Sequence, residues 1–282
     1  MNNKFDWNRF CKVVDKDFRN LWPMFGTTMI VLAVLPFTLW LLLLVLGQGD
    51  HVGMPADIRL MMIEFVAMVA ALMAPSRMYR TWNLRNEGIY YAMLPASKLE
   101  KFLSALLFSL VVCPLTVYLG SMALDMFLTA LPFGSWHEWI WQGKMGFPFS
   151  FDFTHMADYA PNDEGFDTFM YFGTLYNICV WTSYICSVLM FVFTATLFKK
   201  HKVLQTILWL YVINFVLSIV LIPVFMVVFG SADFMEWVTD LITNMSGQQM
   251  ANWFFGITNG FNLLLIALFV WLSWRRLNRM AY

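Results

Sequence analysis

The sequence predicts an all-α, polytopic membrane protein with six transmembrane helices and an N-terminal amphipathic helix at the membrane interface. Two observations support this prediction. Hydrophobic residues make up 60% of the 282 residues and charged residues only 13%, more apolar surface than a soluble domain of this length can bury. In addition, six separate segments are apolar and long enough to cross about 30 Å of hydrocarbon, which takes about 20 helical residues. Residues 1–282 are therefore treated as a single transmembrane domain.

The first predicted element is an amphipathic helix over residues 5–22, which Asp6 is placed to cap. Apolar side chains recur at helical spacing on one face, and charged side chains occupy the other. The apolar set is Trp7, Phe10, Cys11, Val14, Phe18, Leu21 and Trp22, and the charged set is Lys12, Asp15, Lys16 and Arg19. A helix packed on a soluble core has the same pattern, but we favour the membrane interface because the chain offers no soluble core. Pro23 is expected to mark the turn into the bilayer.

Six predicted spans follow, at about residues 24–46, 58–76, 102–124, 168–198, 203–229 and 254–274. Pro36, Pro114 and Pro223 fall inside these spans. A proline is tolerated there as a kink when neighbouring helices satisfy the carbonyl groups that it frees.

The basic residues predict the orientation of the spans. Of the eighteen lysines and arginines, all but Arg59 and Lys144 fall on one side of the six-span arrangement. Because basic residues concentrate on the cytoplasmic side, both termini and the loop 77–101 are expected to be cytoplasmic. The expected location is the bacterial cytoplasmic (inner) membrane, with the lipid bilayer as the surrounding medium.

Two segments are expected on the outer side, at 125–167 and 230–253. The first is rich in aromatic residues, namely Trp136, Trp139, Trp141, Phe147, Phe149, Phe151 and Phe153. An aromatic belt at the interface and an outer vestibule or gate both fit this composition, and we favour the belt. The second has apolar residues at helical spacing between Phe234 and Met245, which predicts a short helix on or in the outer leaflet.

Few side chains suggest chemistry. The cysteines Cys11, Cys113, Cys179 and Cys186 lack a CxxC spacing, and the histidines His51, His137, His155 and His201 lack an HExxH spacing. Neither a disulfide framework nor a metal site is predicted, and no cofactor or nucleic-acid partner is expected. The chain has no GxxxxGK[ST] loop to bind ATP and is not expected to be an enzyme. Any energy from a nucleotide must come from another polypeptide.

Glu64 is the only acidic residue deep inside a predicted span. An intramembrane carboxylate is a candidate site on a proton or cation path. The alternative is a buried acid that bonds to a neighbouring helix or reaches the outer interface, for example beside Arg59. We favour the alternative, because a coupled transporter usually gathers several polar groups at mid-membrane. The other polar positions within spans, Asn177, Asn214 and Asn262, are expected to join helices rather than to bind substrate.

The polar loop between the second and third spans contains the clearest local signal. Ser97 followed by Glu100 forms the capping-box pattern, which predicts a helix start. Pro95 breaks any helix that precedes it. The loop is therefore expected to form a short helix, a corner marked by proline, and a second helix that enters the membrane.

This loop carries a resemblance to a known family. Its residues are Glu87-Gly88 and then Met93-Leu94-Pro95-Ala96-Ser97-Lys98-Leu99-Glu100-Lys101. Together with the N-terminal helix, the six spans and the outer helix before the last span, this stretch resembles the permease subunit of ABC-2 type transporters. One departure is that the largest outer loop lies between spans three and four, whereas the family more often enlarges the region between five and six.

The resemblance implies that the loop forms a coupling helix that docks on an ABC-type ATPase subunit. It also implies a second permease subunit, in a homo- or heterodimer, and ATP-driven export of an unidentified substrate by alternating access. The coupling residues that it implies are Arg85, Glu87, Gly88, Tyr90, Tyr91, Met93, Leu94, Pro95, Ser97, Lys98 and Glu100. Two other classes of function stay open: a secondary transporter or channel, and a membrane scaffold or assembly protein that transports nothing.

Overall fold

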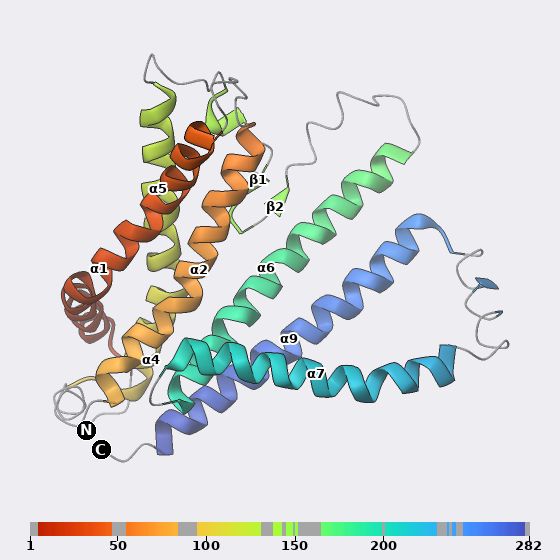
Figure 1. Cartoon of the computed structure of the whole chain (residues 1–282). Helices are drawn as coiled ribbons and strands as arrows, with labels where there is room; N and C mark the ends of the chain where they lie inside the picture. Colours follow the sequence, from red (N-terminus) through yellow and green to blue (C-terminus); the bar gives the residue numbers. More distant parts are fainter. Residues whose placement is uncertain are drawn as a thin grey trace.

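The computed structural model of the chain describes residues 5–46, 55–83, 95–130, 138–142, 145–148, 150–151, 165–198, 201–229, 236, 239–240 and 245–279. Long helices dominate this part of the chain (Figure 1). They are α1 (Trp7–Leu46), α2 (Ala56–Asn83), α4 (Lys98–Leu107), α5 (Cys113–Thr129), α6 (Gly165–Leu197), α7 (Lys202–Phe229) and α9 (Gly247–Arg279). A π-helical turn, Phe108–Val112, joins α4 to α5, and the 3-10 turn Ile140–Gln142 precedes the two-residue strands β1 (Met145–Gly146) and β2 (Ser150–Phe151).

Among the described residues, five helical stretches are long and apolar enough to cross a membrane, and they overlap the second to sixth predicted spans. They are Ala56–Tyr79, Lys98–Thr129, Tyr171–Leu197, Lys202–Ile219 and Gln248–Asn278. The first predicted span lies in α1, where the apolar stretch within the described side chains is the shorter Gly26–Thr38. The chain is therefore a helical, multi-pass membrane protein.

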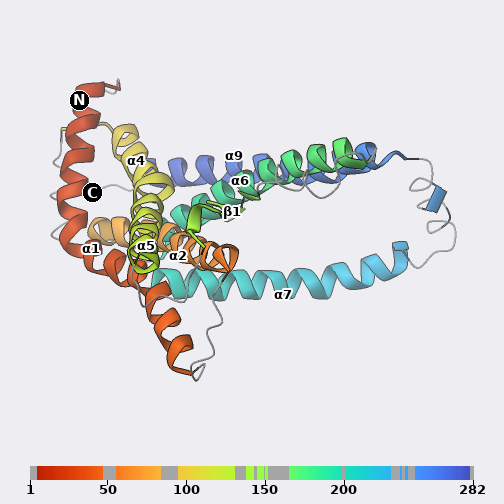
Figure 2. The same cartoon turned by 90° about the horizontal axis from the view of Figure 1, so that it is seen from above.

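Helix α1 differs from the prediction that Pro23 separates an interfacial helix from the first span. One helix runs from Trp7 to Leu46 and contains both Pro23 and Pro36. A proline inside a helix removes a backbone hydrogen bond and bends the helix without having to end it, and α1 changes direction along its length (Figures 1 and 2). The predicted cap is confirmed, because Asp6 Oδ1 accepts a hydrogen bond from the Asn8 backbone N–H at 2.9 Å.

The second span was predicted to end near residue 76, but α2 continues as a helix into the segment 77–101, as far as Asn83. The second helix predicted in this segment is confirmed, because α4 begins at Lys98 with Ser97 as its cap. Residues 84–94 lie outside the described part of the chain, and so does most of the helix predicted near Phe234 to Met245.

Pro114 shows how a neighbouring helix accommodates a proline within a span. The π-helical turn Phe108–Val112 directly precedes it, and Pro114 has no N–H to offer the Leu110 carbonyl. The Tyr184 hydroxyl of α6 donates to that carbonyl at 2.7 Å. The expectation that a neighbouring helix satisfies the freed carbonyl is thus confirmed at this position.

Alanines on α2 allow close packing at the centre of the bundle. Ala67, Ala70, Ala71 and Ala74 are almost completely buried, and small residues let helix backbones approach closely. The main core cluster combines this helix with residues of α4, α5, α6 and the end of α9, including Tyr79, Phe102, Val188 and Leu277.

Helices α6 and α9 pack side by side and run in the same direction, as expected for the fourth and sixth spans of an alternating chain. Tyr171 bonds to Asn252, and the Thr182 hydroxyl donates to Asn259 Oδ1 at 2.7 Å. Asn262 donates to the Ser183 hydroxyl at 2.9 Å. The expectation that Asn262 joins helices is therefore confirmed.

Candidate functional site

Helix α4 begins at the predicted capping box. Ser97 Oγ accepts a hydrogen bond from the Glu100 backbone N–H at 3.2 Å, and the Glu100 carboxylate accepts one from the Ser97 N–H at 2.9 Å. These reciprocal bonds satisfy N–H groups that a helix start otherwise leaves without partners. The capping box is confirmed, and it fixes where the third span begins.

The Glu100 carboxylate also holds the start of α1. Its Oε1 accepts a hydrogen bond from the Asp6 backbone N–H at 3.0 Å and lies 3.3 Å from Arg9 Nη2. The Glu100 side chain is completely buried, whereas Arg9 keeps 32% of its side chain exposed. One carboxylate therefore caps α4 and binds a helix that lies more than ninety residues earlier in the chain.

A second polar contact joins the same two helices further along. The Ser104 hydroxyl donates to Asp17 Oδ2 at 2.6 Å, and both side chains are buried. Burial raises the pKa of the Asp17 carboxyl, while the bond from Ser104 and the charges of Lys16 and Lys101 oppose that rise. We call the two contacts, Arg9–Glu100 and Asp17–Ser104, the N-terminal clamp.

The opposite face of α1 carries exposed aromatic residues. Val13 and Asp17 are buried against the bundle, while Trp7, Phe18 and Trp22 are 66%, 48% and 59% exposed. A soluble amphipathic helix would bury such a stripe, whereas a helix at a membrane interface turns it to lipid. The arrangement favours the interfacial position that the sequence predicts.

The C-terminal end of α9 meets the clamp end of the bundle. Lys98 Nζ donates to the Asn278 backbone carbonyl at 3.2 Å. The Phe102 and Trp274 rings pack with their centroids 6.2 Å apart. The first turns of α1 and α4 and the last turns of α9 therefore form one connected surface.

Four of the predicted coupling residues lie in the described part of the chain, at this same end. Pro95 and Lys98 are exposed, Ser97 is half-buried, and Glu100 is buried inside the clamp. Leu99, next to them, is 39% exposed. Arg85, Glu87, Gly88, Tyr90, Tyr91, Met93 and Leu94 lie outside the described residues.

The opposite end of the bundle contains a buried ion pair. Arg59 Nη1 of α2 lies 3.1 Å from Asp125 Oδ2 of α5, and both side chains are buried. Arg59 also donates to the Thr129 hydroxyl at 3.3 Å and to the Glu138 backbone carbonyl. The Glu138 carboxylate accepts a hydrogen bond from the Ala56 N–H at 3.4 Å, at the start of α2.

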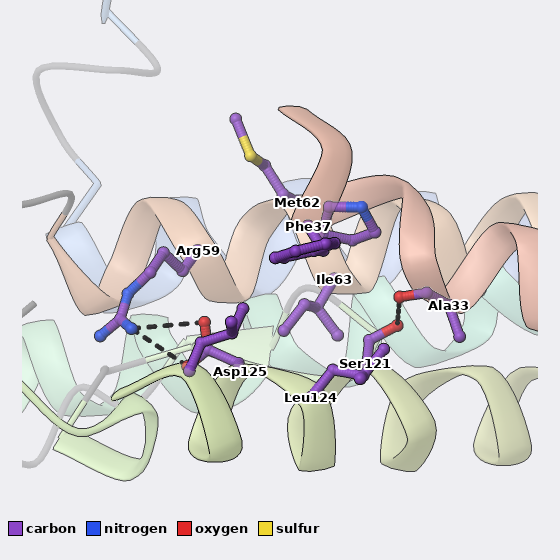
Figure 3. A pocket seen from close by; sticks show the side chains of 10 residues that line it. Ala33, Phe37, Arg59, Met62, Ile63, Ser121, Leu124 and Asp125 are labelled. Atoms are coloured by element: carbon purple, nitrogen blue, oxygen red, sulfur yellow. Dashed lines mark hydrogen bonds and ion pairs between the residues drawn. The ribbon is translucent and has the colours of Figure 1, made fainter. Parts of the chain in front are cut away.

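A small pocket lies beside this ion pair, between α1, α2 and α5 (Figure 3). Phe37, Met62 and Ser121 line it together with the pair, and the Ser121 hydroxyl donates to the Ala33 carbonyl of α1 at 3.2 Å. Its volume of about 20 Å³ is enough for one water molecule and far below that of a small-molecule site. The Arg59–Asp125 ion pair therefore holds α2 and α5 together rather than forming a substrate site.

The aromatic residues of the outer segment divide into two groups. Trp139 and Trp141 stack with centroids 4.7 Å apart, and both are exposed. Phe147, in the turn between β1 and β2, instead packs between the bundle residues Tyr118 and Tyr184, with centroid distances of 5.7 and 5.2 Å. The tryptophan pair fits the predicted aromatic belt, whereas Phe147 anchors the segment to the bundle.

Glu64 lies on α2 and is completely buried. Its helix neighbours Leu60 and Ile63 pack against Tyr118 and Met122 of α5. This position fits a buried acid between two helices. Among the described residues, no group of three or more His, Cys, Asp and Glu side chains is arranged to hold a metal ion.

Comparison with protein-family models, with curated proteins and with solved structures finds no match for this chain.

Proposed function

We propose that this chain is the membrane-spanning permease subunit of an ATP-driven transporter of the ABC-2 type, and that a separate ATPase docks where α1, α4 and α9 meet. The N-terminal clamp is the observation that carries the proposal. It connects the residues that resemble a coupling helix to the amphipathic helix by buried polar contacts.

Buried contacts matter here because a docking element has to transmit motion. A loop that moves independently would absorb a push from a partner, whereas helices joined through Glu100 and Ser104 move together. Helix α4 then continues through α5 to Thr129 at the other end of the bundle. A displacement at Lys98 can in this way reach the Arg59–Asp125 pair.

The same surface is accessible to a partner. Pro95, Lys98 and Leu99 are exposed at the start of α4, and they combine an apolar contact area with a charged rim, as protein interfaces do. In this proposal both termini and this surface are cytoplasmic, and α1 contributes the first of six spans. A second permease subunit completes the transporter in a bacterial inner membrane.

Co-purification in mild detergent tests this proposal. We expect an ABC-type ATPase to co-purify with the unsubstituted chain and to be lost when 94–99 is replaced by a Gly/Ser linker that leaves Glu100 in place. A chain with Leu119→Ser, a substitution on the exposed side of α5, serves as the control and should retain the ATPase. If the unsubstituted chain binds no ATPase, the chain is a scaffold or a secondary carrier.

A further inference from the structure

Helix α7 stands away from the rest of the chain along most of its length (Figures 1 and 2). Its nine consecutive residues 211–219 are all exposed. Nine residues make two and a half helical turns, so every side of this stretch is uncovered by the chain itself. Lipid can cover the apolar side chains, including Tyr211, Phe215 and Leu217, but polar groups need another partner.

Asn214 lies near the middle of this helix and does not suit lipid. One amide N–H bonds to the Leu210 carbonyl at 3.0 Å. The amide has a second N–H and an acceptor oxygen, and no other described residue bonds to either. An exposed carboxamide in hydrocarbon is unfavourable when its hydrogen-bonding groups lack partners. One turn further, Ser218 is a small exposed residue whose hydroxyl donates to the backbone carbonyl of Asn214 at 2.8 Å.

The side-chain amides of α9, unlike that of Asn214, have hydrogen-bond partners on a neighbouring helix of the same chain. Asn262 donates to Ser183, and Asn259 accepts from Thr182, both across the interface with α6. Asn214 is the contrasting case, since its bond stays within its own helix. An exposed side-chain amide near the middle of a membrane-spanning helix therefore indicates that a helix of another subunit packs there.

We propose that a second copy of this chain covers this face of α7, with Asn214 bonding to its counterpart across a two-fold axis. Two copies with the same orientation in the membrane place each residue at the same depth, so a residue near the axis meets itself. A carboxamide both donates and accepts, which makes it self-complementary, and Ser218 lets the two helices approach closely. The inference rests on the proposed function only for the expectation of a second permease subunit.

Cysteine cross-linking in membranes tests the contact. Asn214→Cys and Ser218→Cys place a thiol on the proposed face, and Val212→Cys and Val216→Cys place one at similar depth on the opposite face of α7. The unsubstituted chain, with its four native cysteines, sets the background. On oxidation we expect a disulfide-linked dimer from the first pair of variants and only background from the second. Absence of a dimer, equal yields from both faces, or a product with a different polypeptide would overturn the proposal.

A second measurement separates the amide bond from general packing. Because Asn214 is exposed, its replacement leaves the fold of the single chain intact. Asn214→Leu should weaken self-association in detergent by about three- to tenfold, the range expected for one hydrogen bond between membrane helices, and Asn214→Gln should restore most of it. Self-association of Asn214→Leu at the parent strength would contradict the inference. Neither experiment measures ATPase binding, so a failure of this inference and a failure of the proposed ATPase docking are distinguishable.

Discussion

Glu100→Ala is expected to lower the free energy of unfolding of the chain by about 3 kcal/mol. This is the lower end of the range for breaking a buried ion pair, because Arg9 keeps contact with water. The substitution removes the capping bond with the Ser97 N–H, the bond from the Asp6 N–H and the ion pair with Arg9 Nη2. Denaturant titration in detergent micelles measures the change.

Two further variants separate the roles of this carboxylate. Glu100→Gln keeps one capping bond, since glutamine also serves in a capping box, and should lose about half as much stability as Glu100→Ala. Asp15→Ala breaks the exposed pair with Arg19, whose side chains are 60% and 76% exposed, and should change the free energy by less than about 0.5 kcal/mol. Equal effects of Asp15→Ala and Glu100→Ala would show that the clamp contributes nothing beyond a surface pair.

Arg59→Met is expected to destabilise the chain at least as much as Glu100→Ala, with a loss of about 3 to 5 kcal/mol in the free energy of unfolding. The variant leaves the Asp125 carboxylate buried without the partner that lies 3.1 Å away. It also removes the donor to the Glu138 backbone carbonyl, which connects the outer segment to the start of α2. The same denaturant titration applies.

A double variant provides the control for this pair. Arg59→Met combined with Asp125→Leu removes both charges, and apolar replacement of a whole buried pair is often nearly neutral. We expect the double variant to recover most of the loss and to remain within about 2 kcal/mol of the parent. A double variant as unstable as Arg59→Met alone would mean that packing, rather than an unpaired charge, accounts for the effect.

Features that depend on neighbouring residues were predictable from the sequence. The capping box at Ser97 and Glu100 involves a spacing of three residues, and both its bonds are present. The apolar runs predicted five helices long enough to span a membrane, because about 20 apolar residues suit hydrocarbon wherever they lie in a chain. The first predicted span corresponds to the shorter apolar stretch Gly26–Thr38 within the described side chains. The exposed stripe of Trp7, Phe18 and Trp22 follows from helical spacing in the same way.

Contacts between distant segments were not predictable. Glu100 and Asp6 are separated by 94 residues, and nothing near either residue indicates the other. The predicted charged face of the amphipathic helix did not include Asp17, and its contact depends on the Ser104 hydroxyl of another helix, 87 residues away. The Arg59–Asp125 pair did leave a signal, since Arg59 is one of only two basic residues that the six-span prediction places on the outer side.

The sequence did not predict correctly whether Pro23 ends a helix, because Pro23 lies inside α1. Pro23 was expected to end a helix, but a missing N–H costs one hydrogen bond, which the rest of a long apolar helix outweighs. Pro114 lies within a continuous span, as predicted, and the Tyr184 hydroxyl donates to the carbonyl that the proline frees. The position of α7 away from the bundle had no sequence signal. Asn214 was expected to join helices, but its bond to a described residue stays within α7, at the Leu210 carbonyl.

Site-specific photo-cross-linking tests most directly whether the start of α4 docks an ATPase. A photoreactive residue at Leu99, which is 39% exposed beside the clamp, is compared with one at Leu119, which is 54% exposed on α5. We expect illumination of native membranes to attach the position 99 probe to an ABC-type ATPase, and the position 119 probe to lipid. Labelling of lipid alone at both positions would contradict the proposed docking surface.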